Sequence, residues 1–250
     1  MTSKIYGDDA DELISVYTDM GKAEQMGAGG GGGVGAEETS SSHSHEKAIE
    51  HFLHAHSIAS ANHPGSSSET AKTAEVVANG YLTMAMSSAK PALTPDAVED
   101  ALRSSETYFT EAADIFLLEK GINHPDTIRV TEQLAKINIK LKDFEAAKKY
   151  AKTVLESKIE VYGDMSDETA TSQQTLGTIC LSQANFEEAH KLLKKAQHTL
   201  TQLLGPNAKR VKDIEKMIVI IEQSPQMRDK LSKEKHLHNR PAFSNNFKVK

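Results

Sequence analysis

Histidines are the residues of this chain whose spacing first suggests chemistry. Five of them lie in the segment "HSHEKAIEHFLHAH", namely His43, His45, His51, His54 and His56. Histidine nitrogens are common zinc ligands, and a helix would place His51 and His54 on one face because they are three residues apart. A zinc-protease site needs the H-E-x-x-H pattern, and a zinc finger needs paired cysteines. The chain has neither, so we expect ordinary surface histidines and no metal site.

Two further features resemble functional motifs. The run "GAGGGGGVG" contains the glycine spacing of a dinucleotide-binding turn, but no strand precedes it and no helix is opened by it. It also lacks the lysine and the hydroxyl residue of a phosphate-binding loop. Cys180 falls inside an expected helix at a packed position, which predicts a buried thiol and not a nucleophile. No Ser-His-Asp set or carboxylate pair stands out, so we expect no catalytic residue, no cofactor site and no cofactor.

The overall composition narrows the class of protein. The 250 residues contain 26% charged side chains, no tryptophan, and a formal net charge of −6. This balance gives no general attraction to nucleic acid or to an anionic membrane. The longest apolar cluster, "MIVII" at 217–221, is far shorter than the roughly 18 to 20 residues of a membrane span. A single cysteine excludes an internal disulfide and fits a reducing compartment, so we expect a cytoplasmic, helical protein.

An internal repeat organises the second half of the chain. Shifting the sequence against itself by 42 residues aligns Leu134 with Leu176, Ile137 with Ile179, Phe144 with Phe186, Ala147 with Ala189, and Gly163 with Gly205. Self-similarity at a period of 20 to 50 residues is typical of stacked-repeat proteins. The sequence therefore predicts a stack of similar units.

Each unit contains two expected helices. The first, within "DTIRVTEQLAKINIKLK", has apolar residues at helical spacing: Ile128, Thr131, Leu134, Ile137 and Leu141. The second, "FEAAKKYAKTVLESKIEVY", has Phe144, Ala147, Ala151, Val154 and Leu155 on its buried stripe. Asp143 and Asn185 lie at the tight turn between helices, where a short polar side chain can cap the next helix. Gly163 and Gly205 can end the second helix in a left-handed conformation.

The same spacing extends toward both ends of the chain. Phe109 aligns with Ala151, and Ala48, Phe52 and Ala55 mark a still earlier second helix. Its expected partner is "DADELISVYTDMGKA", with apolar residues Leu13, Ile14, Val16, Tyr17 and Met20. After Gly205, a helix with Val211, Ile214, Ile218 and Ile221 on one face can cover the last unit.

The pattern L-G/A…D/N-F-x-x-A resembles the tetratricopeptide repeat, and the long period resembles the repeats of kinesin light chains. Asn138 and Cys180 depart from it, because they stand where the family has a large aromatic residue. The resemblance implies an all-α fold: a right-handed tetratricopeptide-repeat solenoid of about four helix pairs plus a C-terminal capping helix.

The boundaries expected from these patterns divide the chain into a solenoid and flanking segments. Residues 1–7, "MTSKIYG", repeat the helix end at "SKIEVYG" and are interpreted as the remnant of a preceding repeat, so we expect a fragment of a longer repeat array. Residues 8–224 form the expected solenoid. The Gly/Ser-rich segment 24–44 is expected to be a disordered insert, because it cannot offset its ordering entropy. Residues 225–250 are expected to form a disordered basic tail.

Two segments resemble the C-terminal half of the tetratricopeptide repeat protein 23 family and its like-named relatives. They are "AIEHFLHAHSIASANHPGSSSETAKTAEVVANGYL" and the stretch from "VLESKIEVYGDM" to "LLGPNAKR". The resemblance implies a non-enzymatic scaffold at the ciliary base linked to Hedgehog signalling, or a cytoskeletal adaptor. The alternative is a chaperone-type or cytoskeleton-associated accessory protein that acts through its basic tail.

The expected partner is another protein, held in the concave groove formed by the first helix of each pair. In the third pair this face carries Arg129, Lys136 and Lys140, with Glu132 alone opposing them. In the fourth pair it carries Thr171, Gln174, Thr178 and Ser182, which can donate and accept hydrogen bonds. These eight residues predict a locally basic groove suited to an acidic segment or a C-terminal carboxylate, and the alternative is that they are ordinary solvated residues.

Overall fold

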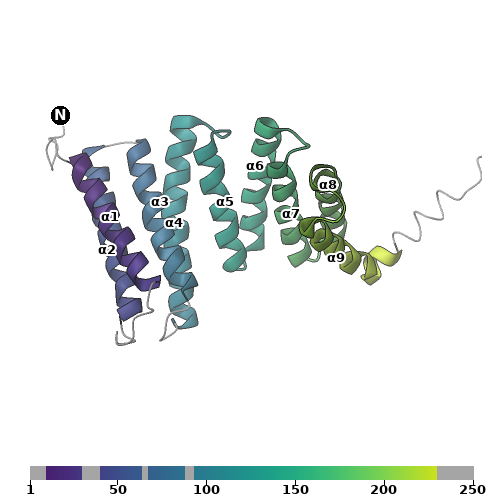
Figure 1. Ribbon diagram of the computed structural model, residues 1–250, viewed down its shortest axis with the longest axis horizontal. Coiled ribbons are helices and arrows are strands. Elements are labelled where there is room, and N and C mark those ends of the chain that lie inside the picture. Colours follow the sequence, from purple (N-terminus) through teal and green to yellow (C-terminus); the bar gives the residue numbers. More distant parts are fainter. Residues whose placement is uncertain (1–9, 30–39, 64–66, 88–92, 230–250) are drawn as a thin grey trace, which may run out of the picture. The chain divides into compact units, whose positions relative to one another are not determined.

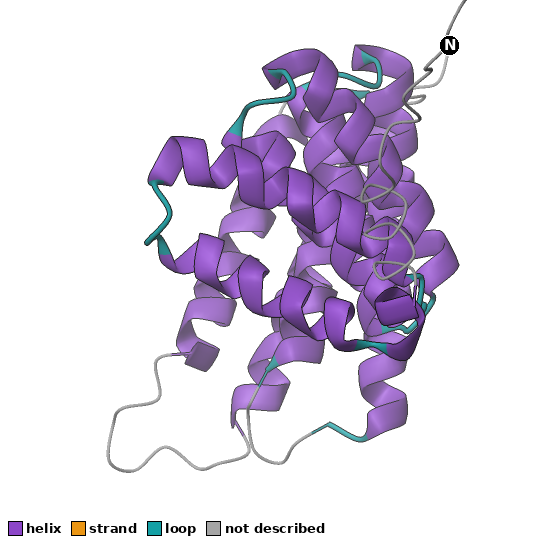
Figure 2. Ribbon diagram, turned by 90° about the vertical axis from the view of Figure 1, so that its right-hand side faces the viewer, coloured by secondary structure: helices purple, strands orange, loops and turns teal. Residues whose placement is uncertain are grey.

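The computed structural model describes residues 10–29, 40–63, 67–87 and 93–229. All regular structure within these ranges is helical (Figure 1), and no strand is drawn there in the second view (Figure 2). The elements are α1 (Ala10–Gly29), α2 (Ser40–Asn62), α3 (Ser68–Met86), α4 (Pro95–Lys120), α5 (Pro125–Lys140), α6 (Phe144–Tyr162), α7 (Asp167–Ser182), α8 (Phe186–Leu204) and α9 (Lys209–Gln223).

The helices belong to two compact units, residues 1–161 and residues 162–250, and each is described by itself. In the first unit α1 packs on α2, α2 on α3, α3 on α4, and α4 on α5. In the second unit α7 packs on α8 and α8 on α9. The predicted all-α repeat fold, with helix pairs α1/α2, α3/α4, α5/α6 and α7/α8 followed by α9, is confirmed.

Polar side chains begin the second helices as their positions predict. The carboxylate Oδ1 of Asp143 accepts a hydrogen bond from the backbone N–H of Ala146 at 3.0 Å. The amide Oδ1 of Asn185 accepts one from the N–H of Glu188 at 3.4 Å. A helix leaves its first N–H groups without backbone partners, and these side chains satisfy one in each case.

The second helices end at glycines, and the hydrogen bond that each of two of these glycines accepts from a threonine recurs after 42 residues. Gly121, Gly163 and Gly205 have φ of +85°, +81° and +82°, a region that other residues rarely adopt. The hydroxyl of Thr127 donates to the carbonyl of Gly121 at 2.8 Å, and the hydroxyl of Thr169 donates to the carbonyl of Gly163 at the same distance. The 42-residue period of the sequence is therefore also a period in the local geometry.

The core of the first unit combines small residues on one helix with large residues on the next. Ala71, Ala74 and Ala78 of α3 form one buried cluster with Phe109 and Phe116 of α4. The alanines let the two helix backbones approach closely, and the phenylalanine rings fill the space beside them.

Phe52 of α2 occupies a narrow space between two glycines on neighbouring helices. A Cβ atom added to Gly21 of α1 would lie 2.3 Å from the Phe52 ring, and one added to Gly80 of α3 would lie 2.9 Å from it. Phe52 itself is only 2% exposed. Glycine at both positions is therefore required by the close approach of the ring.

The segment 24–44, expected to be a disordered insert, is helical at both of its ends. Helix α1 continues to Gly29 and α2 already begins at Ser40. The hydroxyl of Ser44 donates to the backbone carbonyl of Glu24 at 2.7 Å and lies 3.1 Å from its carboxylate. This contact ties the two helix ends together, and the helix-forming residues Ala23 to Met26 favour continuation of α1. The central part of the glycine run, 30–39, lies outside the described residues.

The two ends of the chain are described only in part. Residues 1–7, interpreted above as the remnant of a repeat, lie outside the described residues. In the expected basic tail, residues 225–229 are helical and Met227 is 3% exposed, so the tail begins with an ordered turn. The remainder, 230–250, lies outside the described residues.

Ala184 has a backbone conformation that suits glycine better. Its φ is +57°, and the N–H of Asn185 donates to the carbonyl of Cys180 at 2.9 Å, which completes a Schellman-type helix end. An L-residue with a side chain loses on the order of 1 kcal/mol in this region. We expect Ala184→Gly to raise the free energy of unfolding by about 1 kcal/mol in urea denaturation. The control is Gln183→Gly, where φ is −85°, and it should not raise the free energy of unfolding. Equal increases in the two variants would contradict this explanation.

Candidate functional site

Arg129 is the most strongly held of the predicted groove residues. Its guanidinium pairs with the carboxylate of Glu75 on α3 and lies 2.9 Å from the carboxylate of Asp126 one turn earlier on α5. Burial lowers the pKa of Arg129 from its ordinary value, but a guanidinium stays protonated in proteins. Glu75 is largely buried, with 13% of its side chain exposed. Arg129 therefore links α5 to α3 and is only partly available to a partner.

Glu132, one of the predicted groove residues, also connects α5 to α6. One carboxylate oxygen lies 3.6 Å from the ammonium of Lys136, and the other accepts a hydrogen bond from Lys158 of α6 at 3.2 Å. The Lys158 side chain is only 10% exposed, so its charge needs a partner. The sequence predicts Glu132 as the only carboxylate opposing the groove cations, but Glu75 and Asp126 also lie against Arg129.

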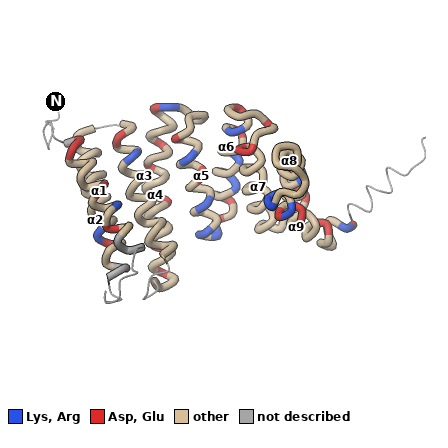
Figure 3. Tube along the Cα trace, in the orientation of Figure 1, with Lys and Arg blue, Asp and Glu red and all other residues tan. Residues whose placement is uncertain are grey.

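Lys136 and Lys140 are the groove cations that remain accessible. Both are exposed, and they are four residues apart on the same side of α5. Lys140 makes no ion pair with any described residue, whereas Lys136 is about half exposed and forms an ion pair with Glu132. Figure 3 shows basic residues gathered toward the C-terminal end of α5. We call Arg129, Glu132, Lys136 and Lys140 the α5 face.

The four predicted residues of α7 lie along one side of that helix, and we call them the α7 face. The hydroxyls of Thr171, Thr178 and Ser182 each donate to a backbone carbonyl four residues earlier, at 2.8, 3.0 and 3.2 Å. Their hydrogens are thus already used, so these hydroxyls can accept hydrogen bonds from a partner more readily than donate them. The amide of Gln174 is the remaining donor of the set. The α5 and α7 faces belong to different compact units.

Arg210 of α9 was not identified from the sequence. Its guanidinium lies 2.5 Å from the carboxylate of Asp167 and donates to the hydroxyl of Thr171 at 2.7 Å. It therefore places an ion pair with Asp167 at the N-terminal end of the α7 face. The 42-residue period could not reveal it, because Arg210 aligns with an acidic residue, Glu168, in the preceding unit.

Two of the five clustered histidines are more buried than the sequence suggested, whereas His43 and His54 are exposed as expected. His45 is 7% exposed and its Nε2 lies 3.2 Å from the hydroxyl of Ser87, and burial lowers its pKa. The ring of His56 lies 3.1 Å from the hydroxyl of Thr73 and 3.4 Å from the carboxylate of Glu111. These two histidines join α2 to its neighbours and are not surface residues. In the described part of the chain no group of three His, Cys, Asp or Glu side chains is placed to hold a metal ion.

The comparisons with known proteins agree with this architecture. Residues 131–198, which span most of α5 to most of α8, match the tetratricopeptide repeat family. The match places tetratricopeptide-type repeats within residues 131–198. It is 27% identical over 186 residues to human tetratricopeptide repeat protein 23, a match that covers 74% of this chain and 39% of that protein. It is 26% identical over 231 residues to the mouse tetratricopeptide repeat protein 23-like, covering 92% of this chain and 43% of that protein.

Solved structures show the same fold at low sequence identity. A putative kinesin light chain of Podosopora anserina with nearly identical repeats superposes with a TM-score of 0.65 at 11% identity, covering 93% of this chain and 95% of that one. The BtubC protein of P. vanneervenii gives a TM-score of 0.58 at 13% identity, covering 96% and 98%. The predicted likeness to kinesin-light-chain repeats is confirmed for the fold.

A coarse functional statement follows from the repeats. Stacked helix pairs of this type present extended surfaces to other proteins, so the repeats matched at residues 131–198 indicate a protein-interaction scaffold, a class that is typically non-enzymatic. The chain spans about two fifths of the length of the human relative. None of the helices in the described ranges has both the length and the apolar character needed to cross a bilayer.

Proposed function

We propose that the α5 face binds an acidic segment of a partner protein. The observation that carries this proposal is the excess of positive charge around α5 in a chain whose formal net charge is −6. The charged groups at this face and in contact with it are the cations Lys120, Arg129, Lys136, Lys140 and Lys158 and the carboxylates Glu75, Asp126 and Glu132. Together these are five cations and three carboxylates, and Lys140, exposed at the end of α5, makes no ion pair with a described residue.

The location of the excess charge favours recognition of a carboxylate-rich partner. Lys136 and Lys140 extend from the last turns of α5, where a cation is also stabilised by the helix dipole. Complementary charges at an accessible surface increase the association rate and orient the partner more than they increase affinity. The α7 face belongs to the second unit, and its acceptor groups on Thr171, Gln174, Thr178 and Ser182 would by themselves hydrogen-bond backbone N–H groups of a partner segment.

The test is a double charge reversal, Lys136→Glu with Lys140→Glu, in the full chain. Neither residue is buried, so the free energy of unfolding should change by no more than about 0.5 kcal/mol. Peptides are selected by display against the full chain, and binding is then measured at two ionic strengths. We expect enrichment of acidic peptides and about a tenfold loss of their affinity in the variant at low salt, with a smaller loss at high salt.

The matched control is Lys191→Glu with Lys195→Glu on α8. These lysines are exposed, four residues apart, and give the same change in net charge. If both double variants weaken binding equally, the effect belongs to net charge and the assignment to the α5 face is wrong. Unchanged affinity in the Lys136/Lys140 variant also contradicts the proposal.

The biological setting is proposed from resemblance alone. Similarity to tetratricopeptide repeat protein 23 favours an adaptor of the ciliary base linked to Hedgehog signalling. A cytoskeletal adaptor is the other role that the resemblance implies. Localisation of the tagged full chain in ciliated cells tests this directly, and absence from the ciliary base would contradict the first role.

A second candidate function rests on the basic tail. From Ser224 onward seven Lys and Arg residues stand against Asp229 and Glu234. The repeats would then serve assembly, and the tail would bind the partner of a chaperone-type or cytoskeleton-associated accessory protein. Deletion of 225–250 separates the two candidates, because binding that disappears with the tail but survives the Lys136/Lys140 reversal favours the second.

A further inference from the structure

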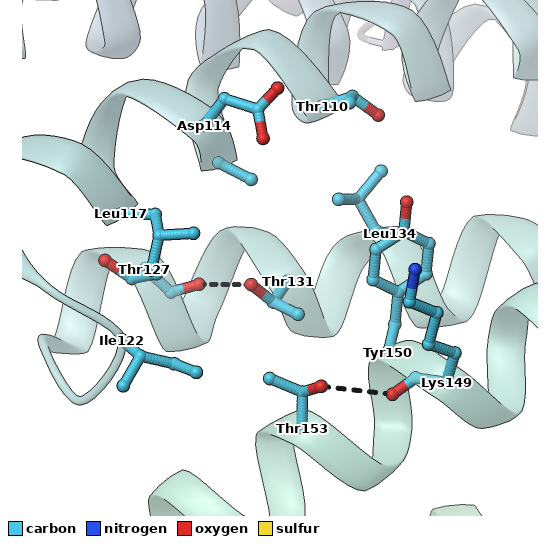
Figure 4. A pocket seen from close by; sticks show the side chains of 11 residues that line it. Thr110, Asp114, Leu117, Ile122, Thr127, Thr131, Leu134, Lys149, Tyr150 and Thr153 are labelled. Atoms are coloured by element: carbon cyan, nitrogen blue, oxygen red, sulfur yellow. Dashed lines mark hydrogen bonds between the residues drawn. The ribbon is translucent and has the colours of Figure 1, made fainter.

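A pocket of about 150 Å³ opens between α4, α5 and α6 in the first unit. Figure 4 shows it from close by, with Leu117 and Ile122 on one side and Leu134 and Tyr150 on the other. Leu117 and Ile122 are unusually exposed for aliphatic residues, at 45% and 48%. The spacing of apolar residues in the sequence does not predict this pocket.

The walls of the pocket offer methyl groups and few free polar atoms. Four threonines line it, and each hydroxyl donates to a backbone carbonyl: Thr110 to Glu106 at 2.8 Å, Thr127 to Gly121 at 2.8 Å, Thr131 to Thr127 at 2.7 Å, and Thr153 to Lys149 at 3.2 Å. With its hydrogen engaged, each hydroxyl has no hydrogen bond to donate to an occupant, and the aliphatic side chains of Ala113, Leu117, Ile122 and Leu134 supply much of the remaining wall. The group that enters the pocket must therefore be apolar.

Two opposite charges lie beside the apolar pocket. Asp114 of α4 and Lys149 of α6 both line it and both are exposed. Neither side chain makes an ion pair within the described residues. Between them, the phenol of Tyr150 is hydrogen-bonded to Thr110, and burial, followed by Glu106 and Asp114, raises its pKa. Tyr150 is therefore neutral, and the free charges at the mouth are one carboxylate and one ammonium.

The size of the pocket limits what can occupy it. A cavity of about 150 Å³ holds a molecule the size of benzene, whereas pockets for drug-sized ligands measure roughly 300 to 1,000 Å³. One leucine, methionine or phenylalanine side chain is the matching size. The two charges at the mouth match the ends of a short helix, which carries free N–H groups at its start and free carbonyls at its end.

We propose that this pocket anchors one apolar side chain of a short amphipathic helix from a partner protein. Asp114 accepts hydrogen bonds from the N–H groups of its first turn, and Lys149 donates to the carbonyls of its last turn. The site is distinct from the α5 face: at about 100° per residue, Thr127, Thr131 and Leu134 lie on the side of α5 opposite to Arg129, Lys136 and Lys140. The scaffold thus has a second binding surface, formed mainly by second helices.

The experiment uses the full chain and a display library of random 12-residue peptides. Ala113 is partly buried at the pocket wall, so Ala113→Phe fills the pocket from inside. We expect selected peptides that share one apolar anchor at helical spacing and become helical when bound. Ala113→Phe should lower the affinity of these peptides about 10- to 100-fold, because burial of one such side chain contributes about that much to binding.

Charge variants test the mouth of the pocket. Asp114→Asn and Lys149→Gln should each lower the affinity of the peptides about 2- to 5-fold. Leu117→Asp places a charge at the exposed lip and should abolish binding without affecting folding, which covers the case that Ala113→Phe fails to fold. The Lys136→Glu, Lys140→Glu chain should bind these peptides as the unchanged protein does, so this proposal can fail or hold independently of the α5 face.

Several results would overturn the proposal. One is that selection yields no peptide whose binding depends on the pocket. Another is that the selected peptides bind as extended strands. A third is that the pocket binds benzene-sized apolar molecules but no peptide. Sedimentation that shows a dimer of the full chain, lost in both Ala113→Phe and Leu117→Asp, would assign the pocket to a second copy of this chain and would equally overturn it.

Discussion

Replacing Phe52 with alanine is expected to lower the free energy of unfolding by about 3 to 5 kcal/mol. The ring is 2% exposed and lies between Gly21 of α1 and Gly80 of α3, so its removal leaves a cavity shared by three helices. Because helix backbones that meet at glycines cannot move much closer, the cavity should collapse only in part. Urea denaturation followed by far-ultraviolet circular dichroism measures the loss.

A second substitution distinguishes this packing from a general loss of apolar area. In the unchanged protein Gly80→Ala brings a Cβ within 2.9 Å of the Phe52 ring, and overpacking of this kind costs about 1 to 3 kcal/mol. In the Phe52→Ala background the same Gly80→Ala fills part of the cavity and gains up to about 1 kcal/mol in helix propensity. We expect its effect to change sign between the two backgrounds. The same sign in both would show that Phe52 and Gly80 are not coupled.

Local features of the sequence predicted the fold because they determine the local geometry. The caps at Asp143 and Asn185 and the glycine ends at Gly163 and Gly205 each depend on neighbours within a few residues. Apolar spacing within one helix likewise predicted the buried stripe of the last helix, including Ile218, which is 2% exposed. Such features need no knowledge of distant contacts.

Contacts between helices could not be predicted in the same way. The pair between Arg129 and Glu75, and the hydrogen bond from Lys158 to Glu132, join residues on different helices. In a sequence these look like ordinary surface charges. As a result the α5 face was assigned one opposing carboxylate, although Glu75 and Asp126 also contact Arg129.

In α1 the spacing of apolar residues also did not predict which of them are buried. The sequence grouped five apolar residues of α1, and Ile14 is buried at 4% exposed, but Val16 and Met20 are 52% and 44% exposed. Which part of a broad apolar face is covered depends on the neighbouring helix, and in the first unit that helix is α2. The α4–α5–α6 pocket has the same origin, because three helices from two helix pairs contribute its walls.

The second large effect is expected at α9, where Ile214→Asp should lower the free energy of unfolding of the second unit by several kcal/mol. Ile214 is 0% exposed in the helix that packs on α8. A buried aspartate there either loses its hydration without an ion-pair or hydrogen-bond partner or must be protonated at an energetic cost. Both alternatives favour dissociation of α9 from α8. Loss of amide-exchange protection in α9, and then in α8, is the expected observation.

Ile220→Asp on the same helix is the matched control for this prediction. Ile220 is 63% exposed, and the substitution has the same helix propensity cost and the same change in charge. Its effect should stay within about 0.5 kcal/mol, because the carboxylate remains in water. If the two variants lose stability equally, α9 does not cover the last helix pair and its predicted capping role is wrong. If only Ile214→Asp unfolds the second unit, the buried face of α9 is the surface that completes the repeat array at α8.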